Sequence, residues 1–284
     1  MMKEDISDQE IRVIGDHAHR HRVRRWWILV AGIAGILMVV VFAYWVGRIS
    51  PETEEIPISM SVSAVKPLAE WMVALDTVTS ACTATTDVQI ADIPLRVYVP
   101  LNARPHLELG YDILDRCTDY MLFFQAADVR ADNGKIVGAF VLRGNPLSWG
   151  LSKRGYCAIL DNAVTIGVAD NSPLFEVATE CGGYFFRQYP LVDNGTVVEN
   201  EQTAKAIRRG LCELDGHIVV CESQKQVQMT EFAQALADLG ATNAIYLTGS
   251  NSVGWCADGQ GGGTRLGDWE NRIYPNANFI VWSR

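Results

Sequence analysis

A turn of small polar residues is the first place where this chain could do chemistry. The segment TGSNS (Thr248–Ser252) follows the apolar run AIYL (Ala244–Leu247), which reads as a buried strand. Ligand sites are common where such a strand ends and small polar groups begin. A plain connecting loop fits the same residues, so the pattern leaves both interpretations open.

The cysteines are candidates for disulfides or for a reactive thiol. All seven lie in the second part of the chain, at Cys82, Cys117, Cys157, Cys181, Cys212, Cys221 and Cys256. Their odd number leaves at least one without a partner in this chain. A two-residue turn at Asp215-Gly216 would set Cys212 opposite Val219, which argues against a bridge between Cys212 and Cys221. Cys181 has no histidine near it in sequence, so a buried thiol or half of a disulfide is favoured over a nucleophile.

The spacing of the histidines predicts no metal site. His17, His19 and His21 alternate in a basic N-terminal tail, and only His106 and His217 follow it. The three histidines of the tail could bind a metal or sense pH, but no fourth ligand is visible there, and a solvated segment is favoured. In residues 48–284 no HxxxH or HExxH pair occurs, and the scattered acidic residues do not form an EF-hand loop. The glycines at Gly259 and 261–263 do not follow the GxGxxG pattern, and we expect a hairpin loop there. The sequence does not identify a cofactor, nor whether Ca²⁺ or another metal takes part.

Net charge excludes one class of partner. The chain has 33 acidic and 24 basic residues, which gives a formal net charge of −9. A nucleic-acid backbone needs a basic stripe, and residues 67–284 offer none. We therefore expect no nucleic-acid partner.

The elements that must position these residues are mostly strands. Leu68 to Thr79 has the spacing of an amphipathic helix, and a second helix is expected from Thr230, as its N-cap, to Gly240. Strands are predicted at Leu95–Val99, Met121–Ala126, Ile136–Leu142, Tyr156–Leu160, Val164–Ala169 and Ala244–Leu247. Hairpin turns are expected at Asp161-Asn162, Asp193-Asn194-Gly195 and Asp215-Gly216. The predicted fold class is α+β: a mixed, largely antiparallel sheet domain with few helices, preceded by one transmembrane helix.

That transmembrane helix is expected at residues 26–47. The run from Trp26 to Gly47 has no charged residue or histidine across 22 positions, enough to span about 30 Å of hydrocarbon. Four arginines (Arg20, Arg22, Arg24 and Arg25) lie within six residues before the run and one follows it closely, so residues 1–25 are expected in the cytoplasm. Residues 48–66 read as a stalk, and 67–284 as one periplasmic or extracellular domain.

Four motifs in the same order along the chain resemble one family. TEFAQALADLGATNAIYLTGSNS (Thr230–Ser252) is similar to a helix–strand–loop unit that ends in "leucine, aspartate, glycine, glycine or serine". FFQAADV (Phe123–Val129) stands at a turn "asparagine, alanine or glycine, glycine, bulky apolar". The stretches 180–195 and 207–223 resemble a "serine, glycine, proline, leucine, valine" segment and an arginine-bearing strand with its partner. From Met121 to Trp282 the chain thus resembles the phosphodiester glycosidase family, whose fold is mixed α+β.

This resemblance implies a site and an activity. It places Arg208, Thr248 and Glu222 in catalytic roles, and it places substrate around Gln125, Gly182, Gly183, Gly249, Ser250, Asn251 and Ser252. Arg208 matches the family's arginine and would hold phosphate with its planar fork of donors, or else form an ordinary ion pair on a strand. Arg209 is expected on the opposite strand face as a solvated charge. Arg187, in FFRQY, would line a sugar site or make a plain surface contact.

Two departures weaken the implied activity. Thr248 stands where the family has aspartate, and Gln125 stands where it has asparagine. Cleaving a sugar–phosphate bond calls for an acid or base, and a carboxylate is the usual choice. Glu180 and Glu222 are the carboxylates nearest the matched motifs and are the candidates to replace that aspartate, although a structural role is favoured for both. We therefore expect weak turnover with retained affinity for a glycan phosphate.

Three functions stay open at this point. The chain is a membrane-anchored hydrolase of a sugar phosphodiester, a module that binds an envelope glycan or sugar phosphate without cutting it, or a scaffold in an envelope complex. A carboxylate that reaches the turn at Thr248 would separate the first from the other two. The oligomeric state is not indicated.

Overall fold

The computed structural model describes residues 62–284, which belong to one compact unit, Ser59–Arg284. The predicted cytoplasmic tail, the predicted span at 26–47 and most of the predicted stalk lie outside these residues. No helix within residues 62–284 is long and apolar enough to cross a membrane. The domain boundaries at 25, 47 and 66 stay predictions.

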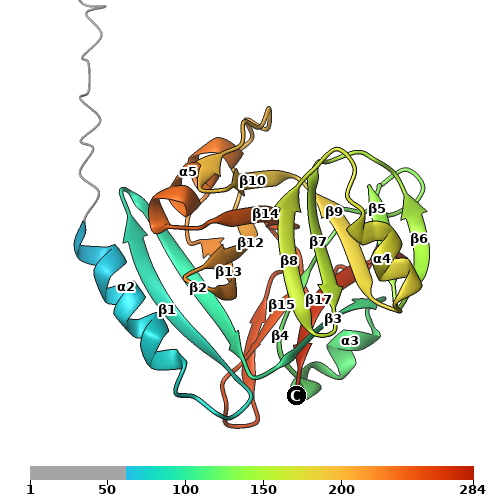
Figure 1. Cartoon of the computed structure of the whole chain (residues 1–284). Coiled ribbons are helices and arrows are strands. Elements are labelled where there is room, and N and C mark those ends of the chain that lie inside the picture. The colour runs from blue at the N-terminus through green and yellow to red at the C-terminus, as the bar shows by residue number, and fades with distance from the viewer. Residues whose placement is uncertain (1–61) are drawn as a thin grey trace, which may run out of the picture. The chain divides into compact units, whose positions relative to one another are not determined.

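Three antiparallel sheets build the domain (Figure 1). The first has the order β1-β2-β13-β12-β14-β10-β11 and contains Cys82–Ile90, Ile93–Leu101, His217–Ser223, Arg209–Leu214, Asn243–Leu247, Pro190–Asp193 and Thr196–Val197. The second, β16-β15-β4-β17-β3, contains Gly263–Leu266, Gly254–Ala257, Tyr120–Gln125, Asn278–Ser283 and Arg104–Leu109. The third, β6-β5-β9-β7-β8, contains Asn145–Trp149, Ala139–Leu142, Tyr184–Gln188, Gly155–Leu160 and Ala163–Val168.

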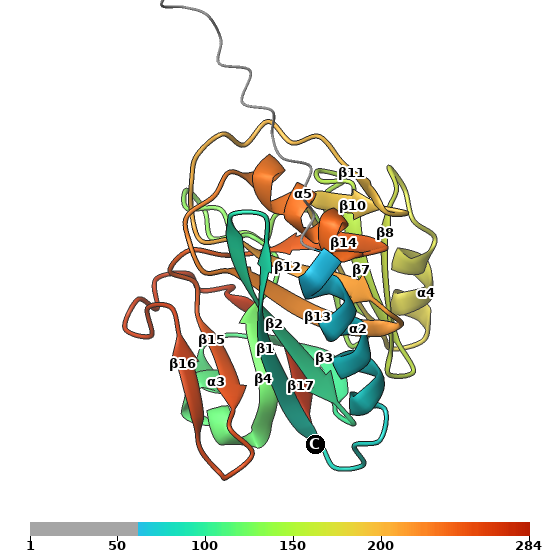
Figure 2. The same cartoon turned by 90° about the vertical axis from the view of Figure 1, so that its left-hand side faces the viewer.

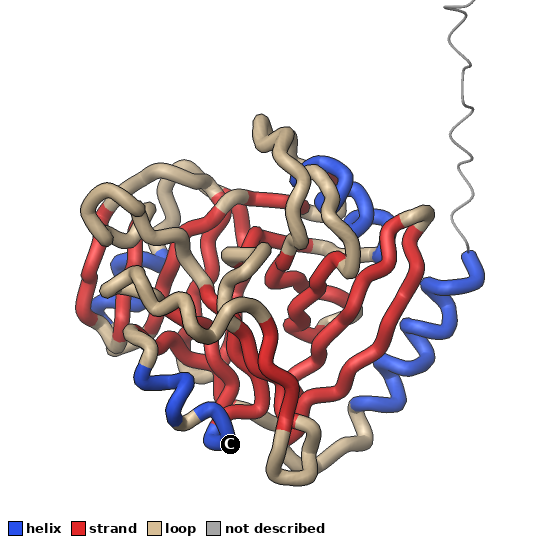
Figure 3. Tube along the Cα trace, turned by 180° about the vertical axis from the view of Figure 1, so that it is seen from behind, coloured by secondary structure: helices blue, strands red, loops and turns tan. Residues whose placement is uncertain are grey.

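The helices lie outside these sheets, as Figure 3 shows with helices in blue around strands in red. They are α2 (Val62–Leu75), α3 (Asp112–Asp115), α4 (Leu174–Glu180) and α5 (Met229–Leu239), with one short 3-10 turn at Cys117–Asp119. Helix α2 lies along β1 (Figure 2). The α+β class with a largely antiparallel sheet is therefore confirmed.

Side chains that alternate between the two faces of a strand explain how the first sheet contributes residues to two hydrophobic cores. Leu95, Val97 and Val99 of β2 point to the face covered by α2 and α5, where Met72 and Phe232 also lie buried. The opposite faces of the three sheets meet in a central core to which each sheet contributes, for example through Val220, Phe124 and Phe186. Because successive side chains point to opposite faces, a single strand can supply both cores.

Several predicted boundaries need correction. Helix α2 begins at Val62, not Leu68, and it ends at Leu75 because the next three amides bond to carbonyls three residues back, which tightens and ends the helix. The predicted N-cap Thr230 is wrong. Gln228 occupies the N-cap position, and its backbone amide donates to the Glu231 carboxylate at 2.7 Å, as in a capping box. Strand β5 begins at Ala139, while Ile136 forms only an isolated bridge with Val129.

The predicted hairpin turns are confirmed. Asp215 and Gly216 both have positive φ and join β12 to β13, as a type I′ turn requires. The register sets Cys212 opposite Val219, as expected, and all seven cysteines are free thiols. The glycine-rich segment 258–262 joins β15 to β16, so the predicted hairpin loop is also confirmed.

Candidate functional site

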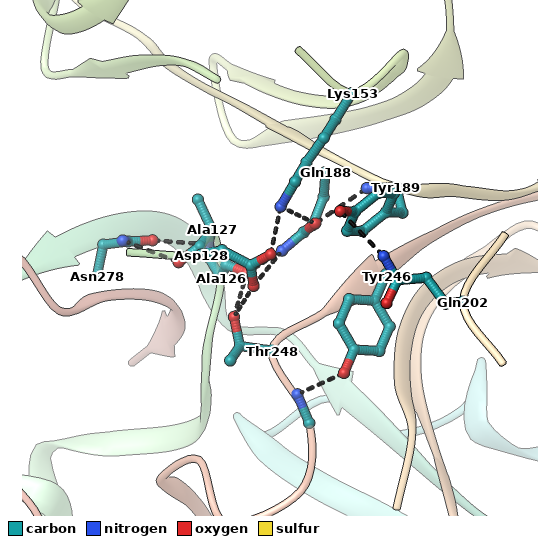
Figure 4. A network of polar contacts seen from close by, with 11 residues as sticks. Ala126, Ala127, Asp128, Lys153, Gln188, Tyr189, Gln202, Tyr246, Thr248 and Asn278 are labelled. Atoms are coloured by element: carbon teal, nitrogen blue, oxygen red, sulfur yellow. Dashed lines mark hydrogen bonds and ion pairs between the residues drawn. The ribbon is translucent and has the colours of Figure 1, made fainter. Parts of the chain in front are cut away.

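A carboxylate that the sequence did not single out reaches Thr248. The Thr248 hydroxyl lies 3.0 Å from Asp128 Oδ1 and 3.2 Å from the Ala126 carbonyl oxygen. Gln188 Nε2 donates to the same Asp128 Oδ1 at 3.1 Å, and Lys153 Nζ forms an ion pair with Oδ2. Figure 4 shows these side chains converging on Asp128. The network thus joins an aspartate, a lysine, an amide and a hydroxyl around one point.

Each of the three sheets contributes a strand end to this point. Asp128 follows β4 of the second sheet, Gln188 ends β9 of the third, and Thr248 follows β14 of the first. Asn278 on β17 fixes the turn before Asp128, since its Oδ1 accepts from the Ala127 amide at 2.7 Å and its Nδ2 donates to the Ala127 carbonyl at 3.1 Å. The site therefore depends on how the three sheets pack, not on one local motif.

Lys153 lies behind Asp128, away from solvent. Its side chain is 5% exposed, whereas that of Asp128 is 31% exposed. Nζ donates to Gln188 Oε1 at 2.8 Å and lies 4.4 Å from the centroid of the Tyr189 ring. Burial lowers the pKa of Lys153, and the neighbouring Asp128 carboxylate acts in the opposite direction. Asp128 is therefore the member of the pair that an incoming molecule would meet.

Arg187 is not the surface contact that the sequence favoured. It is buried, and its guanidinium donates to the carbonyls of Lys153 at 3.0 Å, Ala169 at 2.9 Å and Asp170 at 3.0 Å. Lys153 has φ of 69°, a left-handed conformation that costs free energy for a residue with a side chain. Arg187 thus holds the strained backbone that points Lys153 toward Asp128.

Arg208 is a buried cation with neutral partners. Its Nε donates to the Val227 carbonyl at 3.3 Å, and its Nη2 donates to the Ala204 carbonyl. No carboxylate in the described part of the chain forms an ion pair with it. The guanidinium carbon lies 5.7 Å from the centroid of the Tyr246 ring. Because buried charges are normally paired, this arrangement suits the binding of an external anion.

Tyr246 connects Arg208 to the turn. The Tyr246 hydroxyl accepts a hydrogen bond from the Gly249 amide at 3.1 Å (Figure 4). A Cβ on Gly249 would lie 2.6 Å from the Ile207 carbonyl oxygen, so no larger residue fits between the turn and the strand that carries Arg208. The turn therefore contacts Asp128 through Thr248, and through Gly249 it contacts the tyrosine whose ring lies beside Arg208.

Arg209 contradicts the expectation of a solvated charge. It is buried in an ion pair with Glu222, its partner across β12 and β13, and its Nη1 donates to the Ser252 carbonyl and hydroxyl, both at 2.7 Å. The Ser252 hydroxyl in turn donates to the Thr248 carbonyl. Glu222 thus reaches the turn only through Arg209, and it is Asp128 that reaches Thr248 directly.

The comparison with known sequences now decides the family. A sequence model described as phosphodiester glycosidase matches residues 129–281, more than half of the chain. The chain belongs to the phosphodiester glycosidase family. A search of curated proteins found no match.

Two solved structures share the fold. The catalytic domain of zebrafish N-acetylglucosamine-1-phosphodiester alpha-N-acetylglucosaminidase, auto-inhibited by its pro-peptide, superposes with a TM-score of 0.53 at 8% identity over 72% of this chain and 83% of that one. A hypothetical protein from Synechocystis gives 0.52 at 14% identity over 71% of this chain and 62% of that one. At such identities the likeness concerns the fold alone.

Comparison with the phosphodiester glycosidase motifs suggests why a carboxylate occurs at Asp128. In the resemblance described above, Asp128 stands where the family turn has a bulky apolar residue, and Thr248 stands where the family has aspartate. These two departures contact each other at 3.0 Å. The carboxylate that is missing at Thr248 is thus present at Asp128, in the turn that contacts Thr248. The polar residue at an apolar position was the sequence signal that could have revealed it.

Other positions implied by the phosphodiester glycosidase motifs divide into two groups. Ser250, whose amide donates to the Ile207 carbonyl at 2.8 Å, and Asn251 are exposed on the turn beside Gly249 and Ser252. Gln125 is buried, and its amide contacts the Val253 carbonyl at 3.3 Å, so its backbone lies next to the turn.

Gly182 and Gly183 lie elsewhere. Gly183 precedes β9, whose far end carries Gln188, and five residues of strand span about 16 Å. Both glycines line a separate cavity of about 330 Å³ next to Cys181. Glu180 ends helix α4 at that same remote position and makes no contact with the Thr248 turn. Within residues 62–284 no group of three or more His, Cys, Asp or Glu side chains could hold a metal ion.

Proposed function

We propose that this chain hydrolyses a sugar phosphodiester, with Asp128 as the carboxylate of the reaction and Arg208 as the phosphate-binding residue. The observation that carries the proposal is the 3.0 Å contact between Thr248 Oγ1 and Asp128 Oδ1. It supplies a carboxylate at the turn where the family aspartate is missing. The earlier expectation of weak turnover rested on that absence.

The chemistry can be assigned to these residues. Water adds to the anomeric carbon, the bond from that carbon to the phosphate oxygen breaks, and the phosphate monoester leaves with the electron pair. A phosphate oxygen leaves readily without full protonation, so the main requirements are a base for water and a cation for the phosphate. Asp128 takes the proton from water, while Gln188, Lys153 and Thr248 fix the orientation of its carboxylate. Arg208 binds the phosphate oxygens through its planar guanidinium.

The test is an assay of the full-length chain with N-acetylglucosamine 1-(4-nitrophenyl phosphate), a substrate chosen from the name of the zebrafish relative. Asp128→Asn should lower kcat by about 10²–10⁴-fold, because a general base is lost. Arg208→Ala should raise KM by about 10–100-fold through loss of a charged contact.

The matched control is Asp132→Asn. Asp132 is an exposed carboxylate close to Asp128 in sequence and is paired with Arg130, so its loss should leave both constants unchanged. Binding of the substrate without turnover in the unmodified chain would refute the hydrolase and favour a glycan-binding module.

We further propose that the domain is anchored, with residues 1–25 in the cytoplasm and the phosphodiester glycosidase domain in the periplasm or outside the cell. The support is the apolar run at 26–47 and the excess of arginine before it. A reporter active only outside the cytoplasm, fused after Arg284, should give signal. Signal from a cytoplasm-specific reporter at the same position would overturn this topology.

A further inference from the structure

An apolar cavity lies beside the Asp128 network. It has a volume of about 460 Å³ and is lined by Leu109, Lys135, Ile136, Leu147, Ser148, Trp149 and Asn276. Trp149 and Leu147 lie two residues apart on β6 and are 66% and 44% exposed. Both side chains line this cavity. Large apolar side chains exposed together in a cavity commonly mark a binding site.

The cavity lies between the edges of two sheets. Strand β6 is the edge of the third sheet, and Leu109 ends β3, which is the edge of the second. Polar groups surround the apolar floor. Asn276 uses its Nδ2 to donate to the Gly134 carbonyl at 2.7 Å, which leaves Oδ1 as an acceptor. Lys135 adds a positive charge that forms no ion pair within the described residues.

The wall of the cavity also lies next to the segment that carries Asp128. The Val137 amide, next to Ile136 in the cavity wall, donates to the Asp128 carbonyl at 2.8 Å. From Trp149 the chain runs four residues to Lys153, which limits their separation to about 14 Å. Lys153 is in turn paired with Asp128, so the separation of Trp149 and Asp128 is on the scale of a short oligosaccharide.

We propose that this cavity binds further sugar units of an anionic glycan whose phosphodiester lies at Asp128, with Trp149 stacking on a sugar face. The proposal rests on the proposed function and names its substrate as a glycan chain. Lys135 complements the negative charge of such a chain, and Asn276 Oδ1 accepts from a sugar hydroxyl. An apolar floor with few polar groups suits a pyranose, which has both an apolar face and hydroxyl edges.

The experiment compares two substrates on the full-length chain: the nitrophenyl phosphodiester of a single N-acetylglucosamine, and the same phosphodiester carried by a tetrasaccharide of that sugar. The tetrasaccharide should have a KM about tenfold lower, equivalent to about 1.4 kcal/mol. Trp149→Ala should raise that KM to the single-sugar value, while kcat and the single-sugar KM stay unchanged. Val73→Ala, at an exposed apolar residue of helix α2, is the matched control and should change nothing.

Equal KM values for the two substrates in the unmodified chain would overturn the proposal, as would a preference that survives Trp149→Ala. If neither substrate is cleaved, the hydrolase proposal fails and calorimetric titration with the tetrasaccharide decides the binding site separately. Binding that Trp149→Ala abolishes would support the site. Absent binding, or binding that this substitution does not weaken, would overturn it.

Discussion

The two ends of the turn Thr248–Ser252 contact two different charged networks. At Thr248, the hydroxyl meets Asp128, whose side chain is 31% exposed and has Lys153 behind it. At Ser252, the carbonyl and hydroxyl meet Arg209, which is paired with Glu222 in a site where the two side chains are 2% and 9% exposed. One network is open to an incoming molecule, and the other is closed.

The same contrast separates two neighbouring arginines. Arg209 has a carboxylate partner and hydrogen bonds to the turn, so its charge is satisfied within the protein. Arg208 donates only to neutral carbonyls. A buried ion pair fixes structure, while a buried cation with no carboxylate partner is suited to binding an external anion. Charge pairing therefore distinguishes these two adjacent arginines, which sequence position does not.

The largest effect is expected from breaking the closed network. Glu222→Ala leaves Arg209 buried without a partner and should lower the free energy of unfolding by about 3–5 kcal/mol. Urea denaturation followed by circular dichroism measures this change. The double variant Arg209→Met with Glu222→Leu should recover much of the loss, because it removes both charges. If Glu222→Gln stays folded yet loses as much turnover as Asp128→Asn, Glu222 is catalytic and the contrast is wrong.

The second prediction tests the open network. Thr248→Asp restores the family residue, but it places a second carboxylate about 3 Å from Asp128, where two like charges cannot both ionise freely. We expect kcat to fall by about 10²-fold, or about 2.7 kcal/mol in the activation free energy. Adding Asp128→Thr should restore part of the activity by returning the site to one carboxylate. An increase in turnover for Thr248→Asp alone would show that Asp128 does not serve as the catalytic carboxylate.

Local patterns predicted the elements of this fold well. Alternation and turn residues located the β7–β8 and β12–β13 hairpins, since Asp161-Asn162 and Asp215-Gly216 adopt the positive φ values that these turns require. The end of helix α5 at Gly240 followed from the same kind of local chemistry. The start of that helix was placed two residues too late, because the capping box of Gln228 and Glu231 is a second local signal that competes with the Thr230 hydroxyl.

The candidate site was only partly predictable. Thr248, Gly249 and Arg208 belong to motifs and were found. Asp128, Lys153 and Gln188 come together only because the second and third sheets pack at one point. The sequence alone does not show which groups will lie next to a charged side chain in the folded domain. For that reason Arg209 and Arg187 were expected at the surface but are buried.

The smallest change in stability and activity is expected at a third carboxylate, Glu108. This residue serves as a control for the comparison between Asp128 and Glu222. Glu108 on β3 is 17% exposed and contacts His106 Nε2 at 3.3 Å, the Tyr120 hydroxyl at 2.9 Å and Arg116 Nη2 at 3.1 Å. The contact with His106, followed by those with Tyr120 and Arg116, lowers the pKa of Glu108 from its ordinary 4.5 to about 2. Like the Asp128 network it joins a carboxylate to a cation and a hydroxyl, but it shares no residue with the Asp128 network.

Glu108→Gln should therefore change stability and not turnover. Because the folded-state pKa lies below the unfolded one, the ionised carboxylate stabilises the fold above pH 4.5, and this stabilisation is lost as the pH falls toward 2. At pH 7 the variant should be about 1–2 kcal/mol less stable, since hydrogen bonds to a charged group are weakened. Denaturation at several pH values should show the difference shrinking between pH 4.5 and 2. A difference that stays constant over that range would mean that Glu108 contributes by packing, and a loss of kcat would place it within the catalytic machinery.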